Sequence, residues 1–352
     1  MAAPGMNGYQ RVMTALGNGQ PDRVPVVEFV IDPKVRQAIC PGARDFGDLA
    51  DYLDLDMAGC SAVFDRVGGD EQEWTDEWGV SYHAGPEVVA HPIAGPISSL
   101  EDLRNYRPPD PDAPQRLGLL RDFVQRYKGR RAVCFHHRAA FMWSCYLMGM
   151  ENMLMAMAAE PELADAVLDM VVEVNEQVCR RAVRAGADVV CLGDDYATNL
   201  GPLCSPAHFR RFILPRLKRV IDAIHEEGGK VIKHSDGNLY SLLDMIVEAG
   251  PDGINPIEPA AGMRLSVVKA KYGRRVCIIG NIDCGELLSN GTPDQVEAAV
   301  RQAIADAAAD GGYMISTSNS VHSSVKPQNY VALVQAAHRW GQYPTAEPVP
   351  SR

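Results

Sequence analysis

Polar side chains that can move protons or bind metals recur directly after short apolar runs in this sequence. They are Glu28, His136 and His137, Asp194 and Asp195, His234 and Asp236, Asn255 and Glu258, Asn281 and Asp283, and Ser318, Asn319 and His322. If each apolar run is a strand of one parallel sheet, the carboxyl ends of the strands bring these groups to one face. A single such group could be a helix cap, but a polar group after nearly every run predicts a shared pocket that can transfer protons or hold a metal.

The centre of this pocket is predicted at His234 and Asp236. His234 follows the run KVIK and Asp236 lies two residues further on, so an extended backbone directs both side chains to one side. Glu258, after the next run, could add an oxygen ligand, and all three residues are zinc or magnesium ligands by type. We therefore predict His234, Asp236 and Glu258 as metal ligands, and His234, Asp236 and Asp195 as the catalytic set.

Other residues near the strand ends are predicted to bind substrate. They are Glu28, His137, Tyr196, Asn281, Asp283, Asn319 and His322. Because adjacent residues of a strand point to opposite sides, at most one of His136 and His137 is expected to face the pocket.

Structural roles compete with several of these predictions. Asp194 or Asp195 could cap a helix, and Asn281 and Asp283 could simply shape a turn. Cys284 is the one cysteine placed to act as a nucleophile, but its acidic neighbour Asp283 would raise the pKa of the thiol and make it less reactive.

The elements that must position these groups repeat from about residue 160 onward, where amphipathic helices alternate with short apolar runs. In the helix predicted over 161–186, Leu163, Val167, Val171, Val174 and Val178 form one apolar stripe, and Gly186 follows its end. A later helix is predicted to begin at Thr292 as N-cap, with Pro293 at the first helical position and Gln295 completing a capping box. Alternation of this kind predicts a parallel sheet with right-handed crossovers.

Eight strand candidates favour closure of this sheet into a barrel over an open, doubly wound sheet. Three of them precede the repeating units: VPVVEFV, DMAGCSAV and RAVCFHH. The segment from about 64 to 130 is interpreted as an elaborated loop region, in which Trp74 and Trp78 serve in packing. The fold expected is therefore α/β, a single (β/α)₈ TIM barrel with elaborated N-terminal loops, spanning 1–352 as one domain.

Composition excludes several classes of function. The chain has 352 residues and a net charge of −11, without a block of basic residues, so nucleic acid is not an expected partner. No apolar stretch reaches the ~20 residues that span a bilayer, and no signal peptide is recognised. The nine cysteines are scattered singly, as in reduced proteins. We expect a cytoplasmic protein with a small-molecule substrate, and leave a homodimer open.

The second half of the chain resembles the uroporphyrinogen decarboxylase superfamily. The resemblance covers about residues 135–340 and is carried by the segments FILPRLKRVIDAIHEEGGKVIKHSDGN, GINPIEPAAGM, IIGNIDCGELLSNGTPDQV and GGYMISTSNSVHSSVKPQNY. It implies a barrel enzyme of one of two branches. One branch decarboxylates the four acetate side chains of uroporphyrinogen without a cofactor. The other comprises corrinoid-dependent methyltransferases, which use zinc to activate a thiol or to handle a methyl donor.

The chain departs from the motifs of both branches. The decarboxylases carry two arginines around QAGRY after the first strand, where guanidinium groups bind a substrate with eight carboxylates. Here the matching stretch is VVEFVIDPKVRQAIC, which presents Glu28 and Asp32 first. The thiol-methylating branch has a His-x-Cys motif and a second cysteine near the last strand, where this chain has His234-Ser235-Asp236 and Ser318-Asn319-Ser320.

The leading interpretation is a methyltransferase-like enzyme. It would pass a methyl group from a small methylated substrate, such as a methoxylated aromatic compound, to a corrinoid carried by a partner protein. His234 would be a zinc ligand or a general acid, and Asp236 and Glu258 would be ligands or would orient it. The alternatives are a decarboxylase acting on a porphyrinogen or a smaller acid, and a non-catalytic binding barrel.

The missing arginines generate the first prediction. Purified protein should convert no measurable uroporphyrinogen to coproporphyrinogen, because Glu28 and Asp32 would repel a polyanion where the decarboxylases place guanidinium groups. Chromatography of the porphyrins after anaerobic incubation measures this. Conversion over many turnovers would contradict it.

Overall fold

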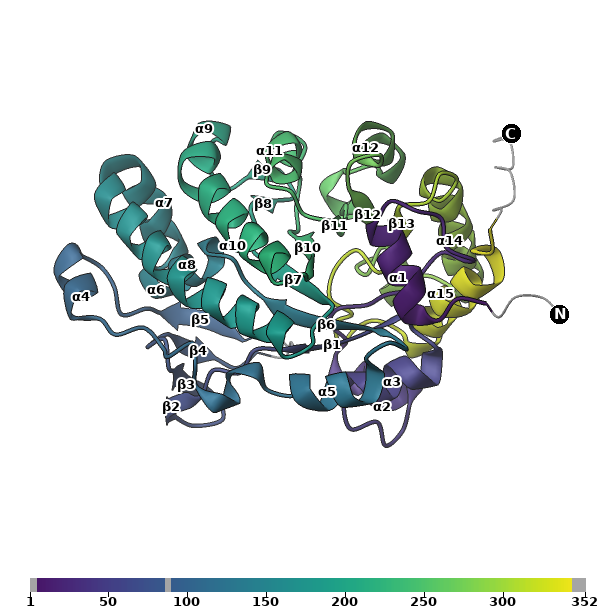
Figure 1. The fold of residues 1–352 in the computed structure, drawn as a ribbon, viewed down its shortest axis with the longest axis horizontal. Coiled ribbons are helices and arrows are strands. Elements are labelled where there is room, and N and C mark those ends of the chain that lie inside the picture. The colour runs from purple at the N-terminus through teal and green to yellow at the C-terminus, as the bar shows by residue number, and fades with distance from the viewer. Residues whose placement is uncertain (1–4, 86–89, 344–352) are drawn as a thin grey trace.

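A curled sheet of seven parallel strands forms the centre of the protein, with helices packed along its outer face (Figure 1). The computed structural model describes residues 5–85 and 90–343. The strand order is β1-β6-β7-β10-β11-β12-β13. Their bounds are β1 Met57–Ser61, β6 Ala132–His137, β7 Val189–Gly193, β10 Lys230–His234, β11 Gly253–Asn255, β12 Cys277–Ile279 and β13 Tyr313–Met314.

Helices connect successive strands, as the alternating pattern predicted. Those before β7 are α1 Gly8–Leu16, α2 Pro33–Ile39, α3 Phe46–Leu53, α4 Leu100–Asn105, α5 Leu120–Tyr127, α6 Phe141–Met148, α7 Met150–Ala159 and α8 Pro161–Arg184. Those after it are α9 Pro206–His208, α10 Leu214–Glu226, α11 Leu243–Glu248, α12 Leu265–Tyr272, α13 Leu287–Asn290, α14 Pro293–Ala307 and α15 Pro327–Trp340. A short antiparallel hairpin, β8 Ala197–Thr198 and β9 Gly201–Pro202, follows β7.

The predicted helix signals are confirmed at two places. In α8 the apolar stripe is buried, and Gly186 follows the helix with φ +111°, a conformation that favours glycine. In α14 the side chain of Thr292 accepts a hydrogen bond from the backbone of Gln295, which completes the capping box.

The first predicted strand, VPVVEFV, is not a strand of the sheet. The segment makes an isolated bridge from Val26 to Ile315, and Ile31, the residue after it, makes another to Val321. The backbone N–H of Val26 donates to the carboxylate of Asp56 at 2.8 Å, so a side chain takes the place of a neighbouring strand. The segment nevertheless lies between the two edges of the sheet, because Val26 O also accepts from the backbone N–H of Asp56.

The inner face of the sheet is a separate apolar core. Alternate residues of the strands, among them Met57, Cys134, Cys191 and Ile232, pack with Val12 and other residues of α1. Gly253 of β11 also faces this core, where a Cβ atom would come within 2.8 Å of Ile279. Helix α1 contacts β1, β6 and β13, and thereby covers one end of the curled sheet.

The elaborated segment after β1 contains regular structure that the sequence did not predict. Strands β2 Arg66–Gly69, β3 Glu73–Asp76, β4 Ser81–His83 and β5 His91–Ala94 form an antiparallel sheet. Trp78 is fully buried and stacks on Trp143 of α6 with ring centroids 5.0 Å apart, in agreement with the packing role expected for it.

None of the helices in the described ranges is long and apolar enough to cross a membrane. All nine cysteines are present as free thiols.

The buried carboxylate of Asp56 generates a stability prediction. Asp56 is 0% exposed, pairs with Arg23 at 2.7 Å and Arg11 at 3.1 Å, and accepts from Val26 N–H. The substitution Asp56→Asn should lower the free energy of unfolding by about 3–5 kcal/mol, because it leaves the buried Arg23 guanidinium without its counter-charge. Equilibrium denaturation in urea measures this.

Asp54→Asn is the matched control. The Asp54 side chain is 68% exposed and lies 3.5 Å from the same Arg23, so its loss should cost less than about 1 kcal/mol. An equal loss of unfolding free energy in the two variants would show that the buried pairing of Asp56 does not stabilise the N-terminal segment.

Candidate functional site

A polar cavity begins where the apolar core of the inner face ends. In β6, Cys134 belongs to the core and His136, two residues later, lines the cavity. The same step of two leads from Ile232 to His234 in β10 and from Cys191 to Gly193 in β7. Because side chains of a strand alternate between faces, the last inner positions of β6, β7 and β10 form the floor of the cavity.

The cavity has a volume of about 480 Å³. Its lining combines acidic, imidazole, aromatic and amide groups with a single guanidinium, that of Arg138. The residues that carry polar chemistry are Glu28, Ser61, His136, His137, Arg138, Asp195, His234, Asp236, Asn255, Thr317, Asn319 and Ser320, and the aromatic walls are Phe29, Phe64, Trp143 and Tyr146.

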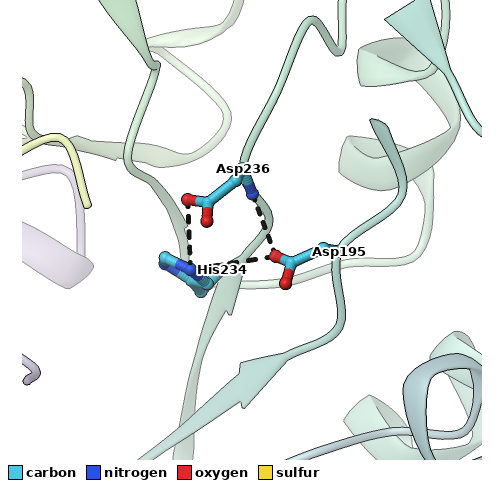
Figure 2. A group of neighbouring side chains, drawn as sticks. All are labelled: Asp195, His234 and Asp236. Atoms are coloured by element: carbon cyan, nitrogen blue, oxygen red, sulfur yellow. Dashed lines mark hydrogen bonds and ion pairs between the residues drawn. The ribbon is translucent and has the colours of Figure 1, made fainter. Parts of the chain in front are cut away.

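Asp195, His234 and Asp236 form a cluster on the cavity floor (Figure 2). One ligand atom from each residue can be chosen so that all three atoms lie within 4.8 Å of one another. Nε2 of His234 is 3.4 Å from Oδ1 of Asp236 and 3.9 Å from Oδ1 of Asp195. The backbone N–H of Asp236 donates to Oδ1 of Asp195 at 3.1 Å, which holds the two acidic residues together.

The orientation of His234 is set by Asn255. Nδ1 of His234 lies 2.6 Å from Oδ1 of Asn255. The amide nitrogen of Asn255 in turn faces two acceptors, Oγ of Ser316 at 3.1 Å and the carbonyl oxygen of Ile279 at 3.4 Å. Oδ1 of Asn255 is therefore the acceptor, Nδ1 of His234 carries the proton, and Nε2 presents either a lone pair or a second proton to the carboxylates.

The pKa values of the two carboxyl groups in the cluster are shifted from their ordinary value in opposite directions. Burial and the negative charges of Asp195 and Glu258 raise the pKa of Asp236, although His234 and the hydrogen bond from Asn319 oppose this. Burial also acts to raise the pKa of Asp195, but His234, the Asp236 N–H and Arg138 outweigh it, so that the pKa is lowered. Asp195 is thus the more readily ionised of the two.

The cluster fits a divalent metal ion. Oδ1 of Asp236 is buried and has no hydrogen-bond partner among the described residues, whereas Oδ2 accepts from Asn319 at 2.9 Å. A metal-ligating histidine typically donates its other ring N–H to a protein oxygen, as His234 does to Asn255. One imidazole and two carboxylates, without a cysteine, form a site for a hard or borderline cation.

Glu28 is a buried acid at the edge of the same cavity. It is 2% exposed, and its Oε2 accepts from the hydroxyl of Thr317 at 2.9 Å. Burial raises its pKa to about 7, against the opposing hydrogen bonds of Thr317 and Phe29. At neutral pH this carboxyl group therefore exchanges a proton readily.

Both histidines at the end of β6 belong to the lining of the cavity, and their side chains have different surroundings. His136 continues the inner face, and its Nε2 is buried without a partner among the described residues. His137 lies 3.1 Å from Oδ1 of Asn175 on α8 and stacks on Phe64. Burial lowers the pKa of His136 to about 4 and that of His137 to about 3.

The model of the uroporphyrinogen decarboxylase (URO-D) family matches residues 76–340. The chain belongs to the URO-D family. The relatives of this family member include two kinds of enzyme. A uroporphyrinogen decarboxylase of Geobacter sulfurreducens is 22% identical over 70% of this chain and 72% of its own length. The methylcobamide:CoM methyltransferase MtbA of Methanosarcina mazei is 24% identical over 94% of this chain and 97% of its own length.

A solved structure supports the fold of this URO-D family member. A methyltransferase from Methanosarcina mazei superposes with a TM-score of 0.77 over 95% of this chain and 99% of the other, at 20% sequence identity. At this identity the likeness establishes the shared fold alone.

Five of the predicted site residues lie outside the cavity lining. Glu258 accepts from the backbone N–H of Gly237 at 2.7 Å, and Asp195 takes its place in the cluster. Tyr196 is buried, and Asn281 donates to the carbonyl of Ile257. Asp283 accepts from the backbone of Gly285, Glu286 and Leu287, which is the turn-shaping role weighed as its alternative. Nδ1 of His322 accepts from the backbone of Ser324.

The structure also adds a role and residues that the sequence did not indicate. Asn255, predicted only as one of the polar groups at the strand ends, orients His234, and Arg138 lines the cavity. Lys233, the neighbour of His234, points to the opposite face, where its ammonium group donates to the carbonyl of Asp194 at 2.7 Å. Burial lowers its pKa to about 8. An ionisable residue inside the run KVIK was the available signal for Lys233, whereas nothing in the sequence distinguished Arg138.

The raised pKa of Glu28 generates a prediction about stability and pH. The folded protein holds this proton up to about pH 7, whereas the unfolded chain releases it near the ordinary value of 4.5. The contribution of Glu28 to stability is therefore complete below about pH 4.5 and is lost as the pH rises through about 7. Relative to Glu28→Gln, the wild type should lose up to roughly 1.4 kcal/mol per pH unit over this range.

Denaturant unfolding of both proteins at pH values from 5 to 8 tests this, since the glutamine cannot ionise. Glu173→Gln, a change at an exposed position of α8, controls for the substitution itself. Unfolding free energies that run parallel for wild type and Glu28→Gln would contradict the pKa assigned to Glu28.

Proposed function

We propose that this URO-D family member is a methyltransferase-like enzyme. It takes a methyl group from a small methylated substrate, such as a methoxylated aromatic compound, and passes it to a corrinoid carried by a partner protein. The observation that carries the proposal is the cluster of Asp195, His234 and Asp236 on the floor of a cavity with aromatic walls. These three residues would hold one divalent metal ion, with zinc as the expected ion.

The ligand types in the cluster favour a substrate that binds the metal through oxygen over one that binds it through a thiol. Where the thiol-methylating branch has a cysteine two residues after the histidine, this chain has Asp236. Ser235, between them, is 2% exposed and accepts from the backbone N–H of Tyr196, so it is no ligand in place of the missing thiolate. Carboxylate ligands suit a harder metal centre, which binds ether or phenolate oxygen in preference to sulfur.

The chemistry required is cleavage of a methyl–oxygen bond, with the bonding electron pair left on oxygen. A divalent metal in the cluster would supply Lewis acidity and stabilise the charge that develops on that oxygen. Asp195 and Asp236 would hold the ion, while Asn255 keeps Nε2 of His234 directed at the same point. Without a metal, His234 could instead donate the proton from Nε2 to the departing oxygen.

Sequence identity alone does not choose between the two kinds of relative, because the uroporphyrinogen decarboxylases are 21% to 25% identical and the MtbA methyltransferases 24%. The charge of the cavity supports the methyltransferase. Its lining holds three carboxyl groups, those of Glu28, Asp195 and Asp236, and one guanidinium, that of Arg138. A substrate with eight carboxylates would meet repulsion at this floor, so decarboxylation of uroporphyrinogen is the less supported function. A non-catalytic binding protein would have no need for the ligand cluster.

We also infer that the sheet closes into a single (β/α)₈ barrel domain, in which residues 24–31 take the position of the eighth strand. The bridge from Val26 to Ile315 on one side and the hydrogen bond from Asp56 N–H to Val26 O on the other support this closure.

The substitution His234→Ala tests the proposed function. It should remove bound zinc and reduce methyl transfer at least 100-fold, because the cluster loses its only nitrogen ligand. The melting temperature should change little, since His234 is a partly exposed residue at the edge of the core. The measurements are zinc per chain by mass spectrometry, and demethylation with a corrinoid protein as the acceptor.

His225→Ala is the matched control, because His225, on α10, is exposed and pairs with Asp252, away from the cavity lining. It should retain zinc and turnover. If His234→Ala loses activity but keeps zinc, His234 acts as an acid and is not a ligand. Normal turnover of His234→Ala with a lowered melting temperature would reject the site.

A further inference from the structure

The cavity contains a group of hydrogen-bond donors that the proposed chemistry does not use. Arg138, Trp143 and Tyr146 all line the cavity, and they come from α6 and the loop that leads into it. Nη1 of Arg138 donates to the carbonyl oxygen of Gly193 at 2.6 Å, and this is the only hydrogen bond of the guanidinium within the described residues. The remaining guanidinium N–H groups have no acceptor there.

The acids near Arg138 are committed to other partners. Both oxygens of Asp194 accept from the backbone at the start of α6: Oδ2 from Ala140 and Phe141, and Oδ1 from Met142. Asp195 accepts from the N–H of Asp236 and faces His234. No carboxylate in the described ranges forms an ion pair with Arg138, so its positive charge is available to a ligand.

The ring of Trp143 forms part of the aromatic wall of the cavity. Trp143 is 8% exposed, and its Nε1 is buried without a hydrogen-bond partner in the described part of the chain. The ring is held in place by Trp78, by Phe64 at 5.2 Å and by Tyr146 at 5.7 Å between centroids. The Arg138 guanidinium lies over the Tyr146 ring at 5.3 Å. A guanidinium with free N–H groups, lying over an aromatic ring in the lining of the cavity, is a recognition site for a planar anion.

We propose that the cavity takes a methyl ether that also carries a carboxylate, and that Arg138 binds this carboxylate. This assignment rests on the proposed function, since it names the class of substrate for the same cavity. The carboxylate of the ligand is directed to Arg138 because Asp195 and Asp236 on the floor would repel it. Its methoxy oxygen is thereby left to the cluster, and the aromatic walls cover the ring between the two ends.

The test measures binding alone, so that it does not depend on a corrinoid partner or on turnover. The probes are 4-methoxybenzoate and its neutral counterpart 4-methoxybenzamide, titrated calorimetrically into the wild type at neutral pH. The benzoate should bind at least 10-fold more tightly, because only its carboxylate can form a charged pair with Arg138.

Arg138→Gln should weaken benzoate binding about 10- to 100-fold and change benzamide binding less than about 3-fold. Arg138→Lys keeps the charge but loses the planar fork, so its loss should be intermediate. Arg339→Gln, which removes a guanidinium that is 60% exposed and pairs with Glu297 on α14, is the control and should bind both probes as the wild type does. Melting curves establish that each variant is folded.

Equal affinity of the wild type for the two probes would overturn the proposal, whether or not any variant folds. So would a preference for benzoate that survives in Arg138→Gln, or the absence of binding by both probes. None of these results affects the proposed function, which stands or falls with the zinc content and turnover of His234→Ala. Loss of zinc in His234→Ala with benzoate preference intact would in turn leave the carboxylate site standing.

Discussion

The hydrogen bond between Nδ1 of His234 and Oδ1 of Asn255 determines which chemistry the cavity floor can perform. Asn255 cannot easily turn, because its amide nitrogen faces acceptors on Ser316 and Ile279. The proton on Nδ1 leaves Nε2 as the only ring atom that faces the carboxylates, at 3.4 Å from Asp236 and 3.9 Å from Asp195. One ligand atom from each of the three residues thus lies within 4.8 Å of the other two, a partial preorganisation that favours both metal binding and acid catalysis.

Much of this arrangement could be predicted from the sequence, because it follows from the two-residue period of a strand. The period places His234 above Ile232 and His136 above Cys134, and the apolar core beneath holds both in register. The same reasoning put Asp236 beside His234. It failed where the chain leaves the strand: Glu258 lies three residues beyond β11, binds the N–H of Gly237 and does not enter the cluster. Beyond a strand end, spacing carries no information about direction.

Other parts of the site depend on contacts between distant segments, which spacing cannot reveal. The two residues Asp194 and Asp195 are identical in type, yet one caps α6 and the other joins the cluster. The first predicted strand became a bridging segment because the side chain of Asp56, thirty residues away in sequence, takes the N–H of Val26. Arg138 could not be recognised from the sequence, because its distinguishing feature is that neither Asp194 nor Asp195 forms an ion pair with it. That feature is visible only in the structure.

The end of β7 joins the two halves of the cavity through three consecutive residues. Gly193 accepts from Arg138, Asp194 holds the first turn of α6, from which Trp143 and Tyr146 project, and Asp195 belongs to the ligand cluster. The Arg138 contact, the first turn of α6 and the acidic cluster are therefore all attached to one short piece of backbone. On the proposed function, this arrangement would select by length and charge together, because the ligand would reach the cluster with an uncharged oxygen while its anionic end stays at Arg138. A polyanion would also bring carboxylates next to Asp195 and Asp236, where like charges repel.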